Sequence, residues 1–151
     1  MNVVTASAHV AITTRVATAD DAEILARLNR NFNGGDEPPQ RLAERMLDPR
    51  RVETPILAEI DGVAVGFAAL RIVPCVFYAS PHAELTELYV DPAHRRQGAA
   101  QALIAHAGQL ALAGGATTLL VLTDFYNDEA QMLYRRTGFV NHDLAMEKTL
   151  V

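Results

Sequence analysis

The sequence predicts a single α/β domain in which a mixed β-sheet carries helices on both of its faces. Three observations lead to this prediction. The chain has 151 residues, which is the usual size of one domain. Apolar patterns typical of strands alternate with helical patterns in the order β-α-α-β-β-β-α-β-α-β. No repeat, linker or low-complexity tract interrupts this order, so residues 1–151 are expected to fold as one domain.

The chain begins with a strand and a helix. Residues 11–17 (AITTRVA) have the composition of a short strand. Thr18 then begins a helix, because Asp20 and Asp21 in the first turn favour the positive end of the helix dipole. Residues 33–35 (NGG) are expected to end it, since glycine tolerates the left-handed backbone found there. The apolar face of this helix comprises Ala22, Ile24, Leu25, Leu28 and Phe32.

A shorter helix and a β-hairpin follow. Residues 38–39 (PP) open the helix and residues 48–49 (DP) end it, since the residue before a proline avoids the helical conformation. Strands at residues 55–60 and 63–73 are joined by residues 61–62 (DG), a strong signal for a two-residue hairpin turn. The apolar side of the short helix is expected to comprise Leu42, Met46 and Leu47.

The second half of the chain alternates strands with helices. Residues 117–123 (TTLLVLT) form a continuous apolar run, typical of a strand that is buried on both faces. Alternation along residues 85–90 places Leu85, Glu87 and Tyr89 on one face of a strand. The expected elements in chain order are a loop at 74–81 (PCVFYASP), a strand at 85–90, a helix at 98–113, a strand at 117–123, a helix from Asn127 or Asp128 to Thr137, and a strand at 139–150.

The composition argues against several classes of function. The formal net charge is −5 at pH 7 and no run of Lys or Arg exceeds two residues, so nucleic-acid binding is not expected. Cys75 is the single cysteine, which excludes an internal disulfide and Cys-rich metal sites and suggests a reducing compartment. Neither a signal peptide nor an apolar run of about 18 residues is visible. A soluble, cytoplasmic protein without a membrane partner is therefore expected.

Residues 85–100 (LTELYVDPAHRRQGAA) carry the strongest chemical signal. A strand leads through a short loop into a long helix, whose first turn presents unpaired backbone N–H groups and the positive end of the helix dipole. Such a turn binds a phosphate or pyrophosphate, and Gly98 would let the backbone approach the anion closely. The segment has neither the G-K-S/T of a Walker loop nor the three spaced glycines of a dinucleotide fingerprint. The residues around Gly98 are small or basic: Arg95, Arg96, Ala99 and Ala100.

This segment resembles the pyrophosphate loop of the GNAT acetyltransferases, whose pattern R/Q-x-x-G-x-G/A is matched by Arg95, Gly98 and Ala100. Arg96 stands where glycine is common in that family. A second match lies downstream, where residues 127–139 (NDEAQMLYRRTGF) fit the family's pattern N-x-x-A-x-x-L/F-Y-x-x-x-G-F. Because the earlier helices and the hairpin also follow the family's order, the resemblance spans nearly the whole chain. The residues that match the second pattern are Asn127, Ala130, Leu133, Tyr134, Gly138 and Phe139.

The resemblance implies a GNAT-like acyl-CoA N-acyltransferase fold, with acetyl-CoA as co-substrate and no metal. The sheet would splay open between the strand that ends at Val90 and the strand that ends at Thr123, and the pantetheine arm of CoA would lie in the opening. Asn127 could serve only as a helix cap instead. The residues implied to contact CoA are Leu88, Tyr89, Val90, Arg95, Arg96, Gln97, Gly98, Ala99, Ala100, Gln101, Asn127 and Ala130.

The implied reaction is direct attack of an amine on the thioester carbonyl, so Cys75 need not act as a nucleophile. A backbone N–H near Leu88 can stabilise the tetrahedral oxyanion. Tyr134 is the implied proton donor to the leaving thiolate, because a tyrosine with a free pKa of about 10 stays protonated at neutral pH. By helical spacing alone it would be a core aromatic. Glu87 is the candidate base that removes the amine's proton, directly or through a water, and Glu84 is its rival.

The acceptor is expected to be a primary amine of a small molecule. Asp124 would bind a cationic substrate or be an ordinary loop residue. Phe77 and Tyr78 would line the acceptor pocket, pack within a loop or form a dimer contact. Acetylation of a protein N-terminus or lysine is an alternative function, and a catalytically silent acyl-CoA-binding sensor is another. By analogy with the family, the chain could form a homodimer in which residues 144–150 pair with another chain.

Overall fold

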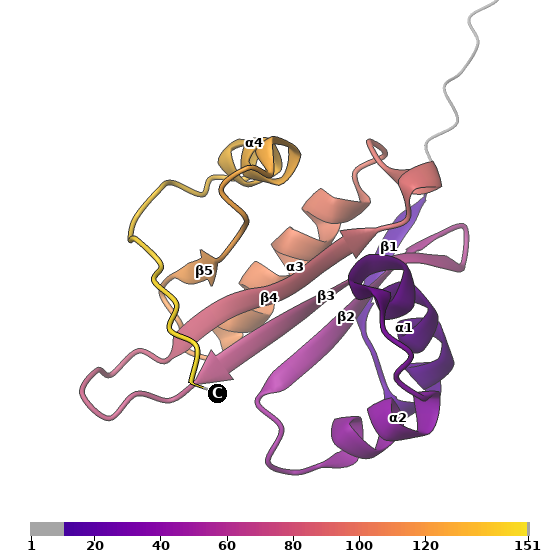
Figure 1. Cartoon of the computed structure of the whole chain (residues 1–151), viewed down its shortest axis with the longest axis horizontal. Helices are drawn as coiled ribbons and strands as arrows, with labels where there is room; N and C mark the ends of the chain where they lie inside the picture. The colour runs from indigo at the N-terminus through magenta and orange to yellow at the C-terminus, as the bar shows by residue number, and fades with distance from the viewer. Residues whose placement is uncertain (1–10, 151) are drawn as a thin grey trace, which may run out of the picture.

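A five-stranded mixed sheet forms the centre of the computed structural model, which describes residues 11–150 (Figure 1). Its strands follow the order β1-β2-β3-β4-β5 and are antiparallel to their neighbours, except that β4 and β5 are parallel. The strands are β1 (Ile12–Val16), β2 (Glu53–Ile60), β3 (Val63–Val73), β4 (His82–Val90) and β5 (Leu119–Val121). The helices are α1 (Ala22–Asn29), α2 (Pro39–Leu47), α3 (Ala99–Ala113) and α4 (Asp128–Arg136).

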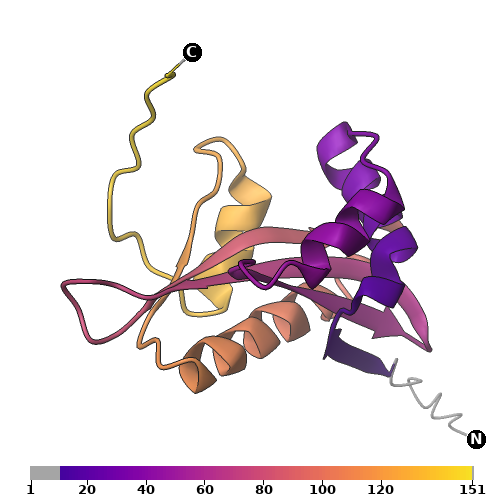
Figure 2. The same cartoon turned by 90° about the horizontal axis from the view of Figure 1, so that it is seen from below.

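Helices cover both faces of the sheet, as the sequence predicts. One face, the α3 face, lies against α3, while α1 and α2 lie against the other, the α1/α2 face (Figure 2). The core of the α3 face includes Leu70 and Leu103, and the smaller core of the α1/α2 face includes Leu57 and Phe67. The alternation of side chains along the strands divides them between these two cores. No helix within residues 11–150 is long and apolar enough to cross a membrane.

A buried carboxylate holds the start of the first helix. Thr18 precedes a short 3-10 turn at Ala19–Asp21, and α1 begins directly after it. The carboxylate of Asp21 accepts hydrogen bonds from Nη1 and Nη2 of Arg15 at 2.8 Å each, and from the backbone N–H of Thr18 at 2.8 Å. These bonds favour the charged form, so the Arg15 guanidinium in particular lowers the pKa of Asp21 to about 2. The predicted helix start is confirmed.

The two N-terminal helices follow the prediction with one correction. The chain leaves α1 through a π-turn that ends at Gly34, where φ is +76°, and α2 begins at Pro39 as expected. Leu42 and Met46 pack against the core of the α1/α2 face, but Leu47 is 73% exposed. Grouping Leu47 with them is wrong, because it lies five positions after Leu42 and therefore about 140° around the helix.

A bulge in the pairing of β3 with β4 reverses part of the predicted alternation. The register shifts so that Glu87 opposes Ala69 while Leu85 opposes Leu70. Leu85 consequently packs into the core of the α3 face, whereas Glu87 points to the α1/α2 face. The prediction that these two side chains share a face is wrong, because a bulge inserts one extra residue into a strand and shifts the alternation.

The C-terminal elements depart furthest from the prediction. β5 spans only Leu119–Val121, and Leu120 and Leu122 are 45% and 60% exposed. The expectation of a strand buried on both faces is wrong, because only Leu119 and Val121 pack against the core of the α3 face, while Leu120 points to the opposite face. β5 lies at the edge of the sheet and pairs with β4 alone. Residues 139–150 form no strand either, since no backbone ladder pairs them within the part of the chain that the structure describes.

Candidate active site

The ladder between β4 and β5 ends early and leaves part of β4 unpaired. β5 pairs with β4 only through Ala83–Leu85, whereas β4 continues to Val90. Beyond Leu85, the edge of β4 that faces β5 therefore has no strand partner within residues 11–150. In Figure 1, α4 lies beyond this edge, on the side of β4 away from β3. The sequence predicts that the sheet opens between these two strands, and the unpaired edge of β4 lies at that place.

The first turn of α3 offers unpaired backbone N–H groups close to the end of β4. Gly98 is the N-cap, its φ of +99° lies in the left-handed region, and no side chain caps the helix there. Ala102 donates to the carbonyl oxygen of Gly98 at 3.0 Å, so the N–H groups before Ala102 have no acceptor inside the helix. Ala99 is buried and adds no bulk toward the open side. This turn has the form of an anion site.

The two arginines of the preceding loop have different placements. Arg95 folds back, so that its Nε donates to the carbonyl oxygen of Val90 at 3.1 Å and its Nη1 lies 3.9 Å from Oε2 of Glu129. Arg95 thus connects the end of β4 with α4. Arg96 is exposed and has a φ of +62°, which is uncommon for a residue other than glycine. Beside them, Nδ1 of His94 is buried without a hydrogen-bond partner in the described residues, as a group satisfied by a ligand or water would be.

The predicted CoA contacts on β4 have only their backbone available. The side chain of Tyr89 is buried on the α1/α2 face, where its ring stacks on Phe32 with centroids 5.2 Å apart. Its hydroxyl donates to Oδ1 of Asp91 at 3.0 Å, and burial together with that carboxylate raises the pKa of Tyr89. Leu88 packs partly against the core of the α3 face. A ligand along this edge would therefore meet main-chain groups, as expected from the resemblance.

The predicted residues of α4 stand on one helix at the far side of the free edge. Asn127 caps α4, because its Oδ1 accepts from the backbone N–H of Ala130 at 3.1 Å. Tyr134 packs partly into the core of the α3 face, and its ring lies edge-on to Phe139 with centroids 5.5 Å apart. Burial raises the pKa of Tyr134, so its hydroxyl is protonated at neutral pH and can donate a proton.

Glu87 lines a cavity of about 510 Å³ on the α1/α2 face. The apolar wall of this cavity includes Leu25, Met46 and Phe67, which come from α1, α2 and β3. Nδ2 of Asn33 approaches Oε2 of Glu87 at 3.4 Å. The cavity has the size of a small-molecule site. Besides its apolar side chains, the lining contains five polar or charged residues: Asn29, Arg45, Arg51, Glu53 and Glu87.

Glu53 is a second carboxylate in this cavity that sequence reasoning missed. The hydroxyl of Thr86 bonds to Oε1 of Glu53 and lies 3.2 Å from the carbonyl oxygen of Ala69. Neither Glu53 nor Glu87 has a cationic partner within 4 Å among the residues that the structure describes. No motif marks Glu53, because only the pairing of β2 with β3 and the bulge in β4 bring it to this cavity.

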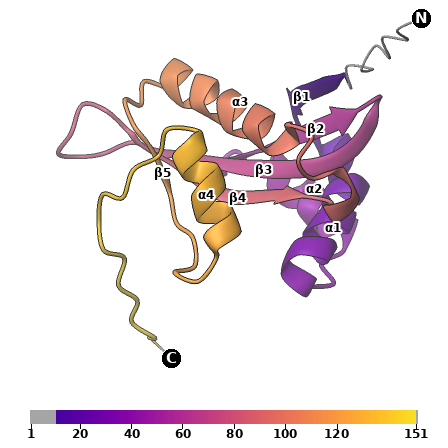
Figure 3. The same cartoon turned by 90° about the horizontal axis from the view of Figure 1, so that it is seen from above.

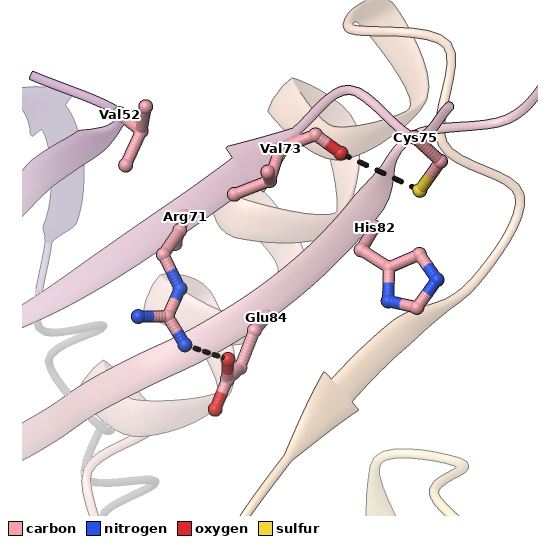
Figure 4. Close-up of a pocket in the computed structure, with 6 residues that line it drawn as sticks. All are labelled: Val52, Arg71, Val73, Cys75, His82 and Glu84. Carbon is pink, nitrogen blue, oxygen red and sulfur yellow. Dashed lines mark hydrogen bonds and ion pairs between the residues drawn. The ribbon is translucent and has the colours of Figure 1, made fainter. Parts of the chain in front are cut away.

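Glu84, the rival base, lies in a second cavity of about 510 Å³ on the same face (Figure 4). Its carboxylate forms an ion pair with Arg71 across the β3–β4 ladder. Figure 4 shows this pair on the strands, with His82 and Cys75 farther toward the loop. Glu84 is thus engaged by Arg71, whereas Glu87 forms no such ion pair among the residues that the structure describes.

Three residues that are predicted to bind the acceptor lie outside the linings of both cavities. Asp124 follows β5, and its Oδ1 accepts from the backbone N–H of Tyr126 at 2.7 Å, which gives it a role in the loop. Phe77 and Tyr78 lie in the β3–β4 loop and are 90% and 70% exposed. No group of three His, Cys, Asp or Glu side chains within residues 11–150 could hold a metal ion.

The chain matches the family model described as "Acetyltransferase (GNAT) family" over residues 21–139. An uncharacterized N-acetyltransferase of Mycobacterium tuberculosis (strain ATCC 25618 / H37Rv) is 34% identical over 99 residues, which is 66% of this chain and 59% of that protein. An uncharacterized N-acetyltransferase of Mycobacterium bovis shows the same values. The alignment thus spans less than two thirds of the length of these relatives.

Solved structures share the fold over nearly the whole chain. The aminoglycoside N-acetyltransferase AAC(6')-Iy in complex with CoA has a TM-score of 0.81 at 22% identity, covering 99% of this chain and 100% of that one. A ribosomal-protein-alanine N-acetyltransferase from Brucella melitensis biovar Abortus 2308 has a TM-score of 0.79 at 21% identity, covering 93% and 100%. At such identities the likeness establishes the fold, which agrees with the predicted fold class.

Proposed function

Because this chain belongs to the acetyltransferase (GNAT) family, we propose that it transfers an acetyl group from acetyl-CoA to a primary amine of a small molecule. The observation that carries this proposal is the placement of two features. The uncapped first turn of α3 at Gly98 stands at the end of β4, and the unpaired edge of β4 begins at Thr86. An anion site next to a free strand edge suits a ligand with a pyrophosphate and an amide-bearing arm.

In this proposal the pyrophosphate of CoA lies on the first turn of α3 and the pantetheine arm pairs with the main chain of β4. The backbone N–H groups of residues 98–101 hold the phosphates, with Arg96 near them in solvent. The arm follows the main chain of residues 88–90, and Asn127 and Ala130 contact it from α4. The exposed side chains of Gln97 and Gln101 flank the phosphate site.

The chemistry proposed for this site is direct attack through a tetrahedral intermediate. The amine enters from the cavity on the α1/α2 face and gives its proton to Glu87, directly or through a water. A backbone N–H near Leu88 stabilises the oxyanion. The C–S bond then breaks, and the CoA thiolate takes a proton from the hydroxyl of Tyr134, whose raised pKa keeps it protonated until that step.

We propose that the acceptor is small and cationic. The volume of the cavity, about 510 Å³, lies within the usual range for small ligands, and Glu53 and Glu87 present two carboxylates to it. The two arginines that also line the cavity are engaged elsewhere, since Arg45 pairs with Glu37 and Arg51 donates to the carbonyl oxygen of Glu53. Neighbours with this fold include aminoglycoside acetyltransferases. Asp124, Phe77 and Tyr78 lie outside the cavity, so we propose that they contact only an acceptor long enough to extend beyond it.

The proposal also covers the cellular compartment of the enzyme, its independence of a metal and its oligomeric state. A single cysteine, Cys75, suits a reducing compartment, so we propose a cytoplasmic enzyme that works without a metal. We also propose that it is a homodimer. Acetylation of a protein N-terminus is the alternative function with a specific observation behind it, because one neighbour acts on a ribosomal-protein alanine.

The direct test is calorimetric titration with acetyl-CoA, followed by a thiol-release assay over a panel of amines. Acetyl-CoA binding together with CoA release in the presence of a small amine would support the proposal. Binding with turnover only on peptide N-termini or lysines would favour the protein acetyltransferase. Binding without turnover on any amine or peptide would favour the sensor, and absence of binding would contradict all three.

Two substitutions separate the proposed roles within the site. Tyr134→Phe should lower kcat on the order of 100-fold while the Kd for acetyl-CoA stays nearly unchanged. Tyr126→Phe is the matched control, because Tyr126 is 87% exposed in the loop before α4. Glu87→Gln should lower kcat by a similar factor, and a larger effect of Glu53→Gln would assign the base to Glu53 instead.

A further inference from the structure

We propose that the second cavity, which contains the ion pair of Arg71 and Glu84, binds a zwitterionic group of the acceptor, so that the acceptor is an α,ω-diamino acid whose distal amine reaches Glu87. This inference rests on the proposed acetyl transfer and names the class of its acceptor. Three observations support it: charges of both signs in one cavity, free hydrogen-bonding groups on both partners of the pair, and a distance to Glu87 that such a molecule can span.

The second cavity adjoins the cavity that contains Glu87. Val52 lines both cavities, and its carbonyl oxygen accepts from the backbone N–H of Ile72 at 3.3 Å. Figure 3 shows α1 and α2 beside the end of the sheet that lies away from the β3–β4 loop. The second cavity is lined mainly by residues of β3 and β4 next to that loop. A ligand that enters the first cavity can therefore extend along the sheet into the second.

The second cavity presents charges of both signs from one pair of residues. In the sheet, Arg71 of β3 lies opposite Glu84 of β4 on one side and opposite Glu53 of β2 on the other. Arg71 pairs with Glu84, whereas Glu53 accepts from the hydroxyl of Thr86 (Figure 4). The side chains of Arg71 and Glu84 are 45% and 19% exposed, so a ligand in the cavity can reach both charges.

Each partner of this pair keeps hydrogen-bonding groups free. Within residues 11–150, Nη2 of Arg71 donates to Oε2 of Glu84, and Nε and Nη1 of Arg71 and Oε1 of Glu84 have no partner. A guanidinium binds a carboxylate through parallel charge-assisted bonds, and a carboxylate accepts such a bond from an ammonium. The α-carboxylate of an amino acid would therefore bind Arg71, while its α-ammonium binds Glu84.

Ligand groups that carry a charge of one sign fit the second cavity less well. The second ammonium of a simple diamine would meet the positive charge of Arg71, and a second carboxylate would meet Glu84. Like charges placed together weaken binding and exclude such ligands. The first cavity, by contrast, presents the carboxylates of Glu53 and Glu87 to an ammonium alone. The two cavities together match a molecule with a zwitterion at one end and an amine at the other.

The spacing of the two sites limits the length of the acceptor. Glu87 lies opposite Ala69, which is two positions before Arg71 on β3. Two residues of a strand span about 6.6 Å, so this is the distance between the zwitterion site and the level of Glu87 along the sheet. In an extended diamino acid, a chain of three or four methylene groups places the distal nitrogen about 5 to 6 Å from the α-carbon. Free ornithine and free lysine have these lengths.

The first experiment compares matched acceptors in the thiol-release assay with acetyl-CoA. Ornithine and lysine should have kcat/KM values at least about tenfold above those of putrescine and cadaverine, which keep both amines but lack the α-carboxylate. Equal or higher values for the diamines, or acetylation of other amines without the diamino acids, would overturn this inference and leave acetyl transfer in place. No release with any amine would contradict acetyl transfer itself.

The second experiment measures binding without turnover, by calorimetric titration of lysine and of cadaverine into the protein saturated with CoA. Arg71→Gln should weaken lysine binding about tenfold but leave cadaverine binding unchanged or tighter, because it removes a like charge from the diamine. Glu84→Gln should also weaken lysine binding. The control Arg50→Gln removes an arginine that pairs with Asp48 outside both cavities, and it should change neither affinity.

The comparison of the two ligands separates recognition of the carboxylate from a general effect on the fold. A variant that merely loosened the sheet would weaken the binding of lysine and cadaverine alike, and thermal unfolding of each variant would detect the loss of stability. Undetectable lysine binding by the wild-type protein, unchanged lysine binding by Arg71→Gln, or equal weakening for both ligands would overturn the inference.

Discussion

Residues 11–113 and residues 114–150 differ in how far each region completes its own packing. The first region contains four of the five strands, the helices α1, α2 and α3, and nearly all of the buried side chains. In the second region Ala116 is the single buried residue within the described chain, while Phe125, Leu144 and Met146 are each more than 80% exposed. Residues 11–113 therefore have a complete hydrophobic core, whereas residues 114–150 leave large apolar side chains exposed to solvent.

This difference divides the proposed CoA site between a rigid half and a weakly held half. The first turn of α3 and the edge of β4 belong to the first region, so the phosphate site is preorganised by a full core. Tyr134 and Asn127 belong to α4, which buries none of its residues fully. Elements with few buried contacts open at low free-energy cost, and such elements are suited to move with a ligand or partner. The predictions below test this division.

The largest effect is expected from the same substitution in a helix of each region. Leu103→Ala in α3 should lower the free energy of unfolding by about 3 kcal/mol, because Leu103 is fully buried and its loss leaves a cavity. Leu133→Ala in α4 should cost about 1 kcal/mol, since that side chain is partly exposed. Urea unfolding followed by circular dichroism measures both. Equal losses would mean that α4 is packed as firmly as α3.

The second prediction concerns the phosphate site of the first region. Gly98→Glu should weaken CoA binding by at least about 100-fold, or about 2.7 kcal/mol, because it places a like charge where the phosphates would lie. A Cβ at this position would also lie 3.3 Å from Cδ1 of Ile12, in a backbone with φ of +99°.

Gly108→Glu is the control, because it adds the same charge to α3 at a position where a Cβ would meet no atom within 4 Å. It should leave the affinity for CoA within about twofold of the wild type. Calorimetry compares the two variants. If both variants bind CoA as the wild type does, the phosphates do not lie on the first turn of α3.

The secondary structure of residues 11–113 was largely predictable because the sequence patterns that determine it are local. Residues 61–62 form the expected hairpin turn, with φ of +49° at Asp61 and +79° at Gly62, and Pro39 opens α2 as expected. The bulge that turns Leu85 away from Glu87 was not predictable, since it depends on the register in which β4 pairs with β3. A run of alternating residues does not reveal where an extra residue will enter it.

In the second region the same reasoning failed for a different cause. The apolar runs at 117–123 and 139–150 have strand composition, but whether such a run forms a strand depends on a partner for its backbone. The structure pairs only Leu119–Val121, and it pairs them on one side. The proposed roles of Gly98, Asn127 and Tyr134 come from the resemblance of two sequence motifs to a known family. No motif indicates Glu53, because it reaches the cavity through strand pairing.

The third prediction is a pH dependence of stability that resides in the first region. The folded pKa of Asp21 is about 2, below the unfolded value near 3.9. Since the folded pKa is the lower one, the carboxylate stabilises the fold above about pH 4 and loses this effect as pH falls toward 2. Asp21→Asn should therefore cost about 2 kcal/mol at pH 7 and progressively less below pH 4.

Asp36→Asn is the matched control, because Asp36 also pairs with an arginine but is 94% exposed. It should change stability by less than about 0.5 kcal/mol at every pH. Chemical unfolding at pH 7, 4 and 2.5 provides the comparison. A loss in Asp21→Asn that is the same at all three values would show that the carboxylate acts without its charge.

The prediction with the smallest expected effect distinguishes the backbone strain at Arg96 from the charge of its side chain. Its φ of +62° costs a non-glycine residue about 1 kcal/mol, so Arg96→Gly should stabilise the protein by up to that amount. Arg96→Ala keeps the strained backbone and should not stabilise. Both variants lack the guanidinium, so a loss of CoA affinity common to the two would report its charge beside the phosphates. If Arg96→Gly binds CoA more weakly than Arg96→Ala, the left-handed backbone at this position is itself part of the site. The strain would then be retained because a more flexible residue would hold the first turn of α3 less firmly.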